Sequence, residues 1–370
     1  MSSHLEYMAR AISLAKQGLF TTDPNPRVGC VLVKDGHILG EGFHRKAGEG
    51  HAEVNALAAA KQAGNDVVGA TAYVTLEPCS HFGRTPPCSE GLIKAGVSTV
   101  VCAMEDPNPE VSGNGFKKLE AAGITVISGV LEAQARQLNP GFIKRMQSGK
   151  PFVRLKMASS LDGRTAMQSG ESQWITGPAA RSDVQKLRAR SSAVITGINS
   201  ILLDDSSLTV RADELGLEAE QSQFIAQRQP LRVVLDSQGR LPSDAKILKG
   251  QGPTLVAVKH GVQVTSDSHD LEVLPLNHDE NGLDLVALLD ELAKRQCNEV
   301  LVETGATLAG QFVAQGLVDE MVLYMAPCLM GNDARGLLNL PFTEMAQKQT
   351  VNIVDTRMVG MDMRLTITFD

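Results

Sequence analysis

Three residues in the first quarter of the chain have types and spacing that could hold a metal ion. His51 opens a predicted helix, Cys79 follows a predicted strand and a proline, and Cys88 comes nine positions later in a polar loop. One imidazole and two thiolates suit tetrahedral Zn²⁺ and leave its fourth position open for water, which distinguishes a catalytic site from a structural one. The pattern therefore predicts a zinc ion that makes water reactive near neutral pH.

Glu53, two residues after His51, is the predicted proton carrier for that chemistry. A carboxylate at the same helix end could move a proton from the water to a departing ammonia without binding the metal. Nucleobase deaminases carry H-x-E followed by P-C-x-x-C, whereas PCSHFGRTPPC places eight residues between the cysteines. A structural zinc site or a chance grouping is the alternative, because HAE and PC are each uninformative alone. Their combined order of helix, strand, loop and helix favours the catalytic site.

The bulk composition favours a small-molecule substrate over a nucleic acid. The formal net charge is −7, and the chain has one Trp and three Tyr. Binding to a phosphate polymer needs clustered cations, and binding to unpaired bases needs stacking aromatic rings. A local basic pocket for a single phosphate is still compatible with this composition.

The cysteines and the apolar segments indicate a cytoplasmic protein. Cys30, Cys102 and Cys328 lie in apolar runs, where a small buried side chain is expected, and Cys297 lies near a predicted helix end. A disulfide framework is not expected in a chain of this length. The chain has no run of 18 apolar residues, so no membrane span is predicted. The first ten residues lack the apolar segment of a secretory signal.

Hydrophobic periodicity predicts alternating helices and strands in the first half of the chain. Residues 4–18 have helical spacing, and residues 28–43 are typical of a β-hairpin that turns at Asp35-Gly36. The other predicted elements are helices at 51–64, 89–95 and 115–122 and strands at 70–76, 98–104 and 124–128. This alternation indicates a three-layer α/β domain with a mixed sheet.

A cluster of turn formers at 147–151 predicts a domain boundary, and 370 residues are too many for one ordinary core. We therefore expect one domain at 1–147 and another at 151–370. In the second, strands are predicted at 151–158, 193–197, 230–237, 253–259 and 298–305, helices at 178–190 and 283–296, and paired strands at 319–327 and 363–370. The polar segment 212–229 is predicted to be a surface helix or loop.

A weaker nucleotide signal lies in the second domain. No G-x-G-x-x-G follows a strand, so the Rossmann fingerprint is absent. Residues 302–310 (VETGATLAG) predict a strand that ends in a glycine-containing turn at a helix start. Backbone N–H groups and the helix dipole could hold a phosphate there. Many α/β proteins have such a turn without a ligand, which is the alternative.

The unusual cysteine spacing and its surroundings resemble one known family. PCSHFGRTPPC, TTDPNPRVGCVLVKDG and HAEVNAL are similar to the deaminase domain of the bifunctional riboflavin-biosynthesis deaminase/reductase. KMASSLDGR, GESQWIT, LLDDSSLTVR, VVLDS and VETGATLAG look like its reductase domain, so the resemblance covers essentially the whole chain. One departure is Ser206, where the family usually has a proline. The resemblance implies a cytidine-deaminase-like three-layer α/β/α domain followed by a dihydrofolate-reductase-like α/β domain.

For the deaminase domain, the resemblance implies that His51, Cys79 and Cys88 bind Zn²⁺ and that Glu53 is the acid/base residue. It also implies substrate contacts from side chains that can match a pyrimidine edge or pair with carbonyl and phosphate oxygens. These are Asn25, His44, His81 and Arg84. For each of these four, a turn residue or a solvated loop side chain is the alternative.

For the reductase domain, the resemblance implies NADPH as the second cofactor. The implied NADPH contacts are Ala158, Trp174, Ser200, Asp204, Ser237, Gly305, Ala306, Thr307, Leu308, Ala309, Gly310 and Gln311. The implied substrate contacts are Ser172, Arg188, Leu208, Arg211 and Glu303. The two arginines suit a phosphate because guanidinium groups bind it bidentately. For Arg188, a solvated position on an amphipathic helix is the alternative.

The implied reactions act in sequence on one small phosphorylated pyrimidine. The amino group at C2 of a diaminopyrimidinone ribosyl phosphate is hydrolysed away, and NADPH then delivers hydride to C1 of the opened ribosyl group. Asp204 and Lys156 are the candidate proton donors for the second step. We expect a homo-oligomer, a dimer or tetramer, that binds neither nucleic acid nor membrane.

Three other functions compete with this interpretation. The first is a nucleoside or tRNA deaminase with an inert appended domain. The second is a folate-type reductase with a structural zinc module. The third is a non-enzymatic, metal-stabilised scaffold, which predicts no affinity for NADPH.

Overall fold

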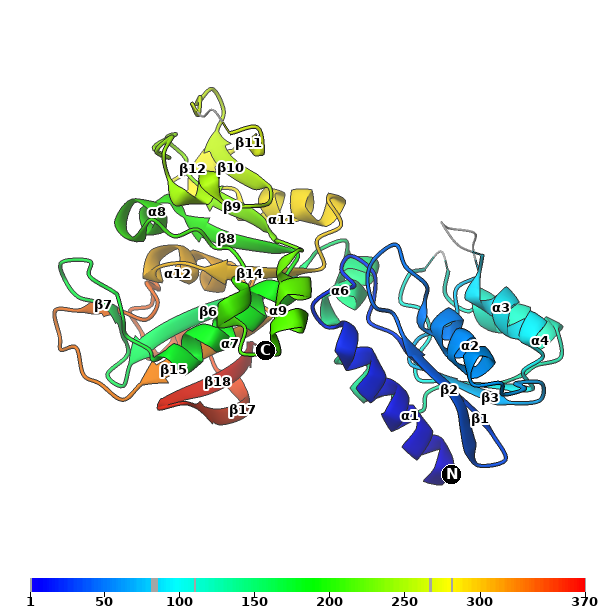
Figure 1. Cartoon of the computed structure of the whole chain (residues 1–370). Coiled ribbons are helices and arrows are strands. Elements are labelled where there is room, and N and C mark those ends of the chain that lie inside the picture. Colours follow the sequence, from blue (N-terminus) through cyan, green and yellow to red (C-terminus); the bar gives the residue numbers. More distant parts are fainter. Residues whose placement is uncertain (1, 81–85, 110, 266–267, 281, 370) are drawn as a thin grey trace. The chain divides into compact units, whose positions relative to one another are not determined.

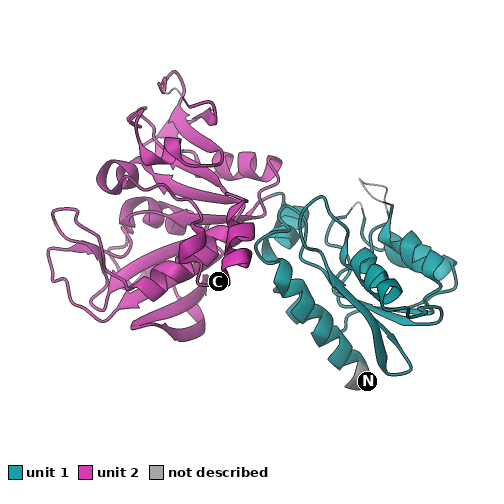
Figure 2. Ribbon diagram, viewed as in Figure 1, with its two compact units in different colours: residues 1–149 teal, residues 150–370 magenta. Residues whose placement is uncertain are grey.

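The computed structural model describes residues 2–80, 86–109, 111–265, 268–280 and 282–369. The chain divides into two compact units, unit 1 at residues 1–149 and unit 2 at residues 150–370 (Figure 2). Both units alternate strands and helices, so the predicted fold class, two α/β domains, is confirmed (Figure 1). In the described part of the chain, no helix has both the length and the apolar character needed to cross a membrane.

Unit 1 is built on one five-stranded sheet in the order β2-β1-β3-β4-β5. β1 pairs antiparallel with β2 and β3, whereas β3, β4 and β5 run parallel. The strands are β1 (Gly29–Lys34), β2 (His37–Phe43), β3 (Thr71–Val74), β4 (Thr99–Cys102) and β5 (Thr125–Ile127). The predicted hairpin is confirmed, because Asp35 and Gly36 both have positive φ, 53° and 78°, between β1 and β2.

Successive side chains of each strand point to opposite faces of the sheet, so the strands contribute to two apolar layers. Val31 and Val33 pack in the layer that also holds α1, α5 and α6, whereas Cys30 and Leu32 pack with α2, α3 and α4. The helices are α1 (Ser2–Ala15), η1 (Lys16–Gly18), α2 (Ala52–Gln62), α3 (Cys88–Ala95), α4 (Asn114–Ala121), α5 (Glu132–Arg136) and α6 (Pro140–Ser148). Unit 1 therefore has the predicted three layers.

Two glycines of β2 set how closely α2 approaches the sheet. A Cβ atom on Gly42 would lie 2.4 Å from the backbone nitrogen of Ala56, and one on Gly40 would lie 2.4 Å from the Ala56 carbonyl oxygen. Only glycine leaves room for a helix backbone at that distance. These contacts fix the first turn of α2, where two of the predicted functional residues lie.

Unit 2 is built on a nine-stranded sheet in the order β11-β10-β9-β8-β14-β6-β15-β18-β17. The strands from β11 to β15 run parallel, and β18 and β17 add antiparallel pairs at one edge. The strands are β6 (Phe152–Ser160), β8 (Ala193–Gly197), β9 (Leu231–Leu235), β10 (Thr254–Lys259), β11 (Leu271–Leu276), β14 (Glu299–Glu303), β15 (Glu320–Ala326), β17 (Val351–Val359) and β18 (Asp362–Phe369). The predicted pairing of segments 319–327 and 363–370 is confirmed by β15 and β18.

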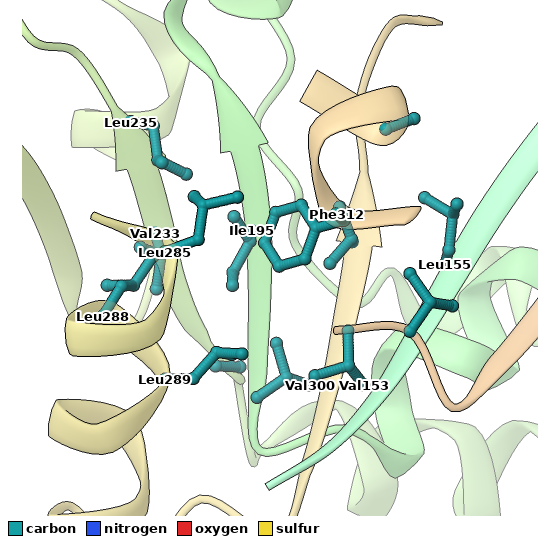
Figure 3. Packing of buried hydrophobic residues seen from close by; sticks show 14 of the residues in the cluster. Val153, Leu155, Ile195, Val233, Leu235, Leu285, Leu288, Leu289, Val300 and Phe312 are labelled. Atoms are coloured by element: carbon teal, nitrogen blue, oxygen red, sulfur yellow. The ribbon is translucent and has the colours of Figure 1, made fainter. Parts of the chain in front are cut away.

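Two apolar layers cover this sheet as well. Leu288, Leu289 and Phe312 of α11 and α12 pack on Val153, Leu155, Ile195, Val233 and Val300 from one side (Figure 3). Residues of α7, α8 and α10 pack on the other side. The helices are α7 (Pro178–Arg190), α8 (Ile198–Asp204), η2 (Ala212–Glu214), α9 (Ala219–Ala226), α10 (Lys246–Lys249), α11 (Leu285–Lys294), α12 (Ala306–Ala314) and η3 (Met345–Gln347). Short pairs form between β12 (His278–Asp279) and β13 (Gly282–Leu283) and between β7 (Arg164–Ala166) and β16 (Arg335–Gly336).

Segment 212–229 holds η2 and α9, and most side chains of α9 are exposed, so of the two predicted alternatives the segment is the surface helix and not the loop. Ser222 and Ile225 are its buried residues. One element differs from the sequence-based prediction. β17 was not predicted, because its side chains are mostly exposed and lack a clear alternation of apolar and polar residues.

Arg154 is a buried cation at the centre of the nine-stranded sheet. It is 1% exposed, and it forms ion pairs with Glu299 on β14 (2.9 Å) and with Glu320 on β15. Arg190 also contacts Glu299, at 3.0 Å. A buried charge needs such partners, because removing one partner leaves the other desolvated and uncompensated.

We expect Arg154→Met to lower the free energy of unfolding of unit 2 by about 3 kcal/mol, because Glu320 and Glu299 lose a buried partner. Urea unfolding followed by circular dichroism would measure the change. Lys246→Met, which removes an ion pair whose side chains are 67% and 47% exposed, is the control and should lower it by less than about 1 kcal/mol. Equal effects of the two substitutions would contradict the prediction.

Candidate active sites in the two units

The structure brings His51, Cys79 and Cys88 together in unit 1. His51 is the N-cap of α2, Cys79 lies in the loop after β3, and Cys88 is the first residue of α3. The Nδ1 atom of His51 lies 3.2 Å from Sγ of Cys88 and 3.7 Å from Sγ of Cys79. All three donor atoms lie within 4.8 Å of one another.

These distances fit a tetrahedral zinc ion. Zn–N and Zn–S bonds of about 2.0 Å and about 2.3 Å place the nitrogen and sulfur donors about 3.5 Å apart, between the two observed values. In the described part of the chain, no other group of three or more His, Cys, Asp or Glu side chains could hold a metal. Cys88 also begins α3, and the partial positive charge at a helix N-terminus favours a thiolate.

The two thiols are unequal in the absence of a metal. A hydrogen bond from Cys88 lowers the pKa of Cys79, and the same contact raises the pKa of Cys88. The backbone N–H of Cys88 also donates to Sγ of Cys79, at 3.3 Å. The contacts therefore favour a thiolate on Cys79, the form that binds zinc, whereas Cys88 has to lose its proton to become a ligand.

Glu53 lies in the first turn of α2 beside this cluster and is only 4% exposed. Its carboxyl group interacts with the Cys88 thiol. Burial raises the pKa of Glu53 to about 7. A carboxyl group with such a pKa can both accept and release a proton near neutral pH.

Two more predicted substrate residues lie next to the metal ligands. Nδ2 of Asn25 lies 3.1 Å from Nε2 of His44, whose Nδ1 lies 3.1 Å from the Gly50 carbonyl oxygen. The His44 ring meets the His51 ring edge-on at 5.3 Å. Burial lowers the pKa of His44, which favours the neutral ring. The predicted contacts His81 and Arg84 lie outside the described residues.

Sequence reasoning missed Glu77, a buried carboxylate two residues before Cys79. Glu77 is 3% exposed and accepts hydrogen bonds from the backbone N–H groups of Asp106, Gly113 and Gly115 at 2.8–3.0 Å. It thereby holds the loop after β4 and the start of α4. The only sequence signal was a charged residue at the end of a buried strand.

The loop held by Glu77 presses against the chain segment that carries Cys79. A Cβ atom on Gly115 would lie 2.2 Å from the Pro78 carbonyl oxygen. The carboxylate therefore joins the ends of β3 and β4 and restricts the backbone next to a metal ligand.

Unit 2 has a cleft of about 530 Å³ at the carboxyl ends of β6, β8, β9 and β14. Ligands in α/β sheets with parallel strands bind at this edge. The predicted residues that line it are Ala158, Ser172, Trp174, Arg188, Ser200, Asp204, Leu208, Ser237, Glu303, Gly305, Ala306, Thr307, Leu308 and Gln311. Ala309, Gly310 and Arg211 are not among the lining residues.

Two of these three residues, Ala309 and Gly310, are packed inside unit 2. Ala309 is fully buried in the core on the far side of α12, and a Cβ atom on Gly310 would lie 2.1 Å from the Asn339 carbonyl oxygen. Gly310 is therefore a packing residue, whereas Gly305 is the N-cap of α12 and has no side chain to cap it. The N–H groups of the first turn are left to hold a phosphate.

The substrate end of the cleft is charged. Arg188 forms a bidentate ion pair with Glu303 at 2.6 and 2.9 Å, and it also donates to the Thr209 carbonyl oxygen. Burial raises the pKa of Glu303, but the charge of Arg188 outweighs it and holds that pKa below its usual value. Lys156 lies directly opposite Glu303 in the β6–β14 register and lines the same cleft.

A zinc site in a cytidine-deaminase-like domain, joined to a second α/β domain with a nucleotide-sized cleft, defines a bifunctional deaminase–reductase. The family model of the cytidine and deoxycytidylate deaminase zinc-binding region matches residues 1–104, and that of the RibD C-terminal domain matches residues 151–362. The chain belongs to the RibD family of riboflavin biosynthesis proteins.

Relatives match along nearly the whole chain. The riboflavin biosynthesis protein RibD of Escherichia coli (strain K12) is 51% identical over 366 residues, 97% of each chain. Form 1 of Acinetobacter baumannii RibD has a TM-score of 0.89 at 48% identity, covering 100% of this chain and 99% of that one. The structure of a diaminohydroxyphosphoribosylaminopyrimidine deaminase/5-amino-6-(5-phosphoribosylamino)uracil reductase from Thermotoga maritima has a TM-score of 0.87 at 34% identity, with the same coverage.

The chain is thus a deaminase and a reductase of riboflavin biosynthesis, as the sequence predicts. Zn²⁺ and NADPH are the cofactors that fit its two domains. The matches include the second domain at full length, which decides against an inert appended domain, a structural zinc module and a non-enzymatic scaffold.

We expect Glu77→Gln to release zinc about 10- to 100-fold faster, because the amide loses the charge that gathers three backbone donors beside Cys79. Competition with a colorimetric chelator would measure the release. Glu105→Gln is the control in the same loop, because among the described residues Glu105 accepts a hydrogen bond from the half-buried Ser112 hydroxyl alone. Reductase activity of the same chain should be unchanged, and zinc release at the wild-type rate would show that Glu77 does not position the ligand.

Proposed function

We propose that unit 1 hydrolyses the 2-amino group of 2,5-diamino-6-(5-phosphoribosylamino)pyrimidin-4-one and that unit 2 reduces the ribosyl group of the product to ribityl with NADPH. The name of the Thermotoga maritima relative, a diaminohydroxyphosphoribosylaminopyrimidine deaminase/5-amino-6-(5-phosphoribosylamino)uracil reductase, supports these substrates. The observation that carries the deaminase step is the grouping of one imidazole and two thiols beside a buried carboxyl group.

His51, Cys79 and Cys88 hold the zinc ion in this proposal. When bound, zinc supplies the Lewis acidity that makes water nucleophilic at neutral pH. Glu53 takes a proton from the attacking water and gives it to the amino group, which leaves as ammonia. The second proton of the water moves to the adjacent ring nitrogen as C2 becomes a carbonyl carbon. The burial of Glu53 suits this role, because a pKa of about 7 allows both transfers.

Asn25 and His44 are proposed to orient the pyrimidine. The contact between them fixes both side chains, and the neutral His44 ring places no second positive charge beside the metal. An amide and a neutral imidazole can match the donors and acceptors of the ring edge. His81 and Arg84 stay predictions for the same pocket.

In unit 2, the first turn of α12 is proposed to hold the NADPH pyrophosphate, and Trp174 to contact the nicotinamide half. NADPH supplies the hydride for the reduction at C1. Trp174 is 69% exposed, and the Arg181 guanidinium lies 4.6 Å from its ring centre. This ring is available to a ligand because no core packing holds it.

The two arginines predicted for the substrate phosphate differ in their surroundings. Arg188 is already paired with the buried Glu303, so we assign it the role of orienting that carboxylate toward the substrate hydroxyl groups. Arg211 does not line the cleft, but its charge is close enough to lower the pKa of Glu303. It is 42% exposed and pairs with the partly exposed Glu214, so a phosphate can replace that partner. We therefore propose Arg211 as the phosphate contact.

Lys156 is the better of the two candidate proton donors. It faces the cleft beside Glu303, and burial lowers its pKa, which eases proton release. Asp204 lies at the end of α8, where its Oδ1 accepts a hydrogen bond from Nε2 of Gln173.

A dimer is the proposed assembly, with β17 as its interface. β17 ends the nine-stranded sheet, and Ile353, Val354 and Met358 are each about 60% exposed. Asp355 and Arg357 flank Thr356, so two antiparallel β17 strands centred there would place each Asp355 opposite the partner subunit's Arg357. Such a self-complementary strand suits a two-fold interface.

We also propose that the enzyme works in the cytoplasm. All six cysteines are free thiols, and two of them are proposed metal ligands. Thiols persist in the reducing environment of that compartment.

For the deaminase step, we expect Glu53→Gln to keep its zinc and to lower ammonia release about 10²- to 10⁴-fold, because the proton carrier is lost. Metal analysis and an ammonia assay on the pyrimidinone would measure both. NADPH-dependent reduction of the supplied deaminated product is the internal control and should be unchanged. Full ammonia release, or turnover of cytidine or RNA in place of the pyrimidinone, would contradict the proposal.

For the assembly, we expect Ile353→Glu/Met358→Glu to convert the dimer into a monomer, because the charges would be buried without partners at the interface. Sedimentation velocity at micromolar concentration would show the change. Val68→Glu is the control, since Val68 is 58% exposed in unit 1. A dimer that survives the double substitution would place the interface elsewhere.

A further inference from the structure

Arg240 lies in the loop after β9 and faces the cleft of unit 2. It lines the cleft together with Ser237 and Asn199, and its side chain is 45% exposed. Its contacts within the chain are weak: Nη2 donates to Oδ1 of Asn199 at 3.4 Å, and Nε lies 3.8 Å from Oδ1 of Asp236. Most of the five N–H donors of this guanidinium can therefore turn to a ligand.

Asp236, at the end of the same strand, is turned away from the cleft. It is fully buried, and its Oδ2 accepts the backbone N–H of Leu241 at 2.8 Å. A carboxylate that faces the cofactor at such a strand end would hold the ribose 2′-hydroxyl of NADH, whereas an arginine accommodates the 2′-phosphate of NADPH. This loop presents a hydroxyl, from Ser237, and a guanidinium, and it keeps its carboxylate inside.

The sheet order places this loop at the adenosine end of a bound dinucleotide. The substrate end is marked by Lys156 and Glu303 on β6 and β14, and the first turn of α12 follows β14. β9 lies two strands from β14 on the side away from β6, which is about 10 Å across the sheet. A ribose next to the pyrophosphate spans a distance of that order.

The four other cations among the described lining residues are engaged elsewhere, and Lys156 lies beside Glu303 at the opposite end of the cleft. Arg188 is paired with Glu303, and Arg181 lies on the Trp174 ring. Arg335 belongs to the β7–β16 pair, where its guanidinium lies against Gly170. Among the described lining residues, Arg240 is the cation at the β8–β9 end.

We propose that Arg240, with Ser237, binds the 2′-phosphate of NADPH and thereby sets the preference of the reductase for NADPH over NADH. This rests on the proposed NADPH site in unit 2. The guanidinium forms charge-assisted hydrogen bonds to the phosphate oxygens, and the Ser237 hydroxyl donates to the same group. NADH lacks this phosphate and gains nothing from Arg240.

The test compares ligands that differ only in the 2′-phosphate, and it needs no turnover. Isothermal titration of the full chain with 2′,5′-ADP and with 5′-AMP would measure the contact directly. We expect Arg240→Ala to weaken 2′,5′-ADP about 10- to 100-fold and to change 5′-AMP less than twofold. Nicotinamide fluorescence should show the same selective loss for NADPH over NADH, and Arg240→Lys should restore part of it.

Lys259→Ala is the matched control. Lys259 is an exposed cation at the end of the neighbouring β10, its backbone N–H lies 3.4 Å from the Ser237 carbonyl oxygen, and it does not line the cleft. It should change neither ligand more than twofold. If Lys259→Ala weakened 2′,5′-ADP as selectively as Arg240→Ala does, the effect would come from the overall positive potential of the region. The proposed role of Arg240 would then be wrong.

The remaining outcomes separate the inference from the proposed cofactor site. If the wild-type chain binds neither NADPH nor 2′,5′-ADP, the cofactor site itself is wrong. If the wild-type chain binds both ligands, the cofactor site is supported. If Arg240→Ala then weakens the binding of NADPH and NADH equally, or weakens neither, the proposed role of Arg240 is wrong. Unchanged ammonia release by unit 1 would show that the variant chain is folded.

Discussion

Parallel strands bring their carboxyl ends to one edge of a sheet, and the arrangement of both candidate sites depends on this constraint. A parallel pair needs a crossover, so the strands that border the sites are followed by loops at the same edge, and after β3, β4, β8, β9 and β14 the next element is a helix. In unit 1 that edge carries Cys79 after β3 and the loop after β4 that Glu77 holds. In unit 2 it carries the ends of β8, β9 and β14, which line the cleft. Residues far apart in the chain meet there because the loops that follow parallel strands all lie at that edge.

Helix N-termini complete both sites at these edges. His51 caps α2 and Cys88 begins α3, so two helix ends meet at the group of metal donors. Gly305 occupies the N-cap position of α12 at the cleft of unit 2. The partial positive charge of each helix end favours an anionic group, which we propose to be a thiolate in the first case and a phosphate in the second. In this proposal one physical effect serves two different cofactors.

Buried charge is used differently in the scaffold and in the sites. Arg154 is enclosed by its carboxylate partners within the sheet and has no access to a ligand. Arg188 and Glu303 are paired just as closely, yet they lie at the wall of the cleft. Burial of Glu53 raises its pKa, and the nearby His51 offsets only part of that effect. The groups proposed to move protons are therefore those whose charge the fold leaves incompletely compensated.

Local sequence patterns were enough to predict much of the fold and part of the two candidate sites. The hairpin at Asp35-Gly36, the alternation of strands and helices, and the imidazole, thiols and carboxyl group beside His51 could all be predicted, because each depends on residue type and short spacing. Sequence reasoning could not find Glu77, whose donors come from residues 106–115, or the closure of Arg188 on Glu303 across 115 positions. It also grouped Gly310 with the cofactor contacts, whereas packing against Asn339 explains that glycine.

The amino-acid sequence by itself determined which chemistry we propose for this protein, because the candidate metal donors, acid/base residue and phosphate-binding turn are recognised from residue types at short range. The tertiary structure alone decided which nitrogen of His51 faces the sulfur atoms, which arginines are already neutralised, and that Asp236 turns inward while Arg240 faces the cleft. These properties depend on burial and on contacts between distant segments, and burial and distant contacts exist only once the sheets have formed.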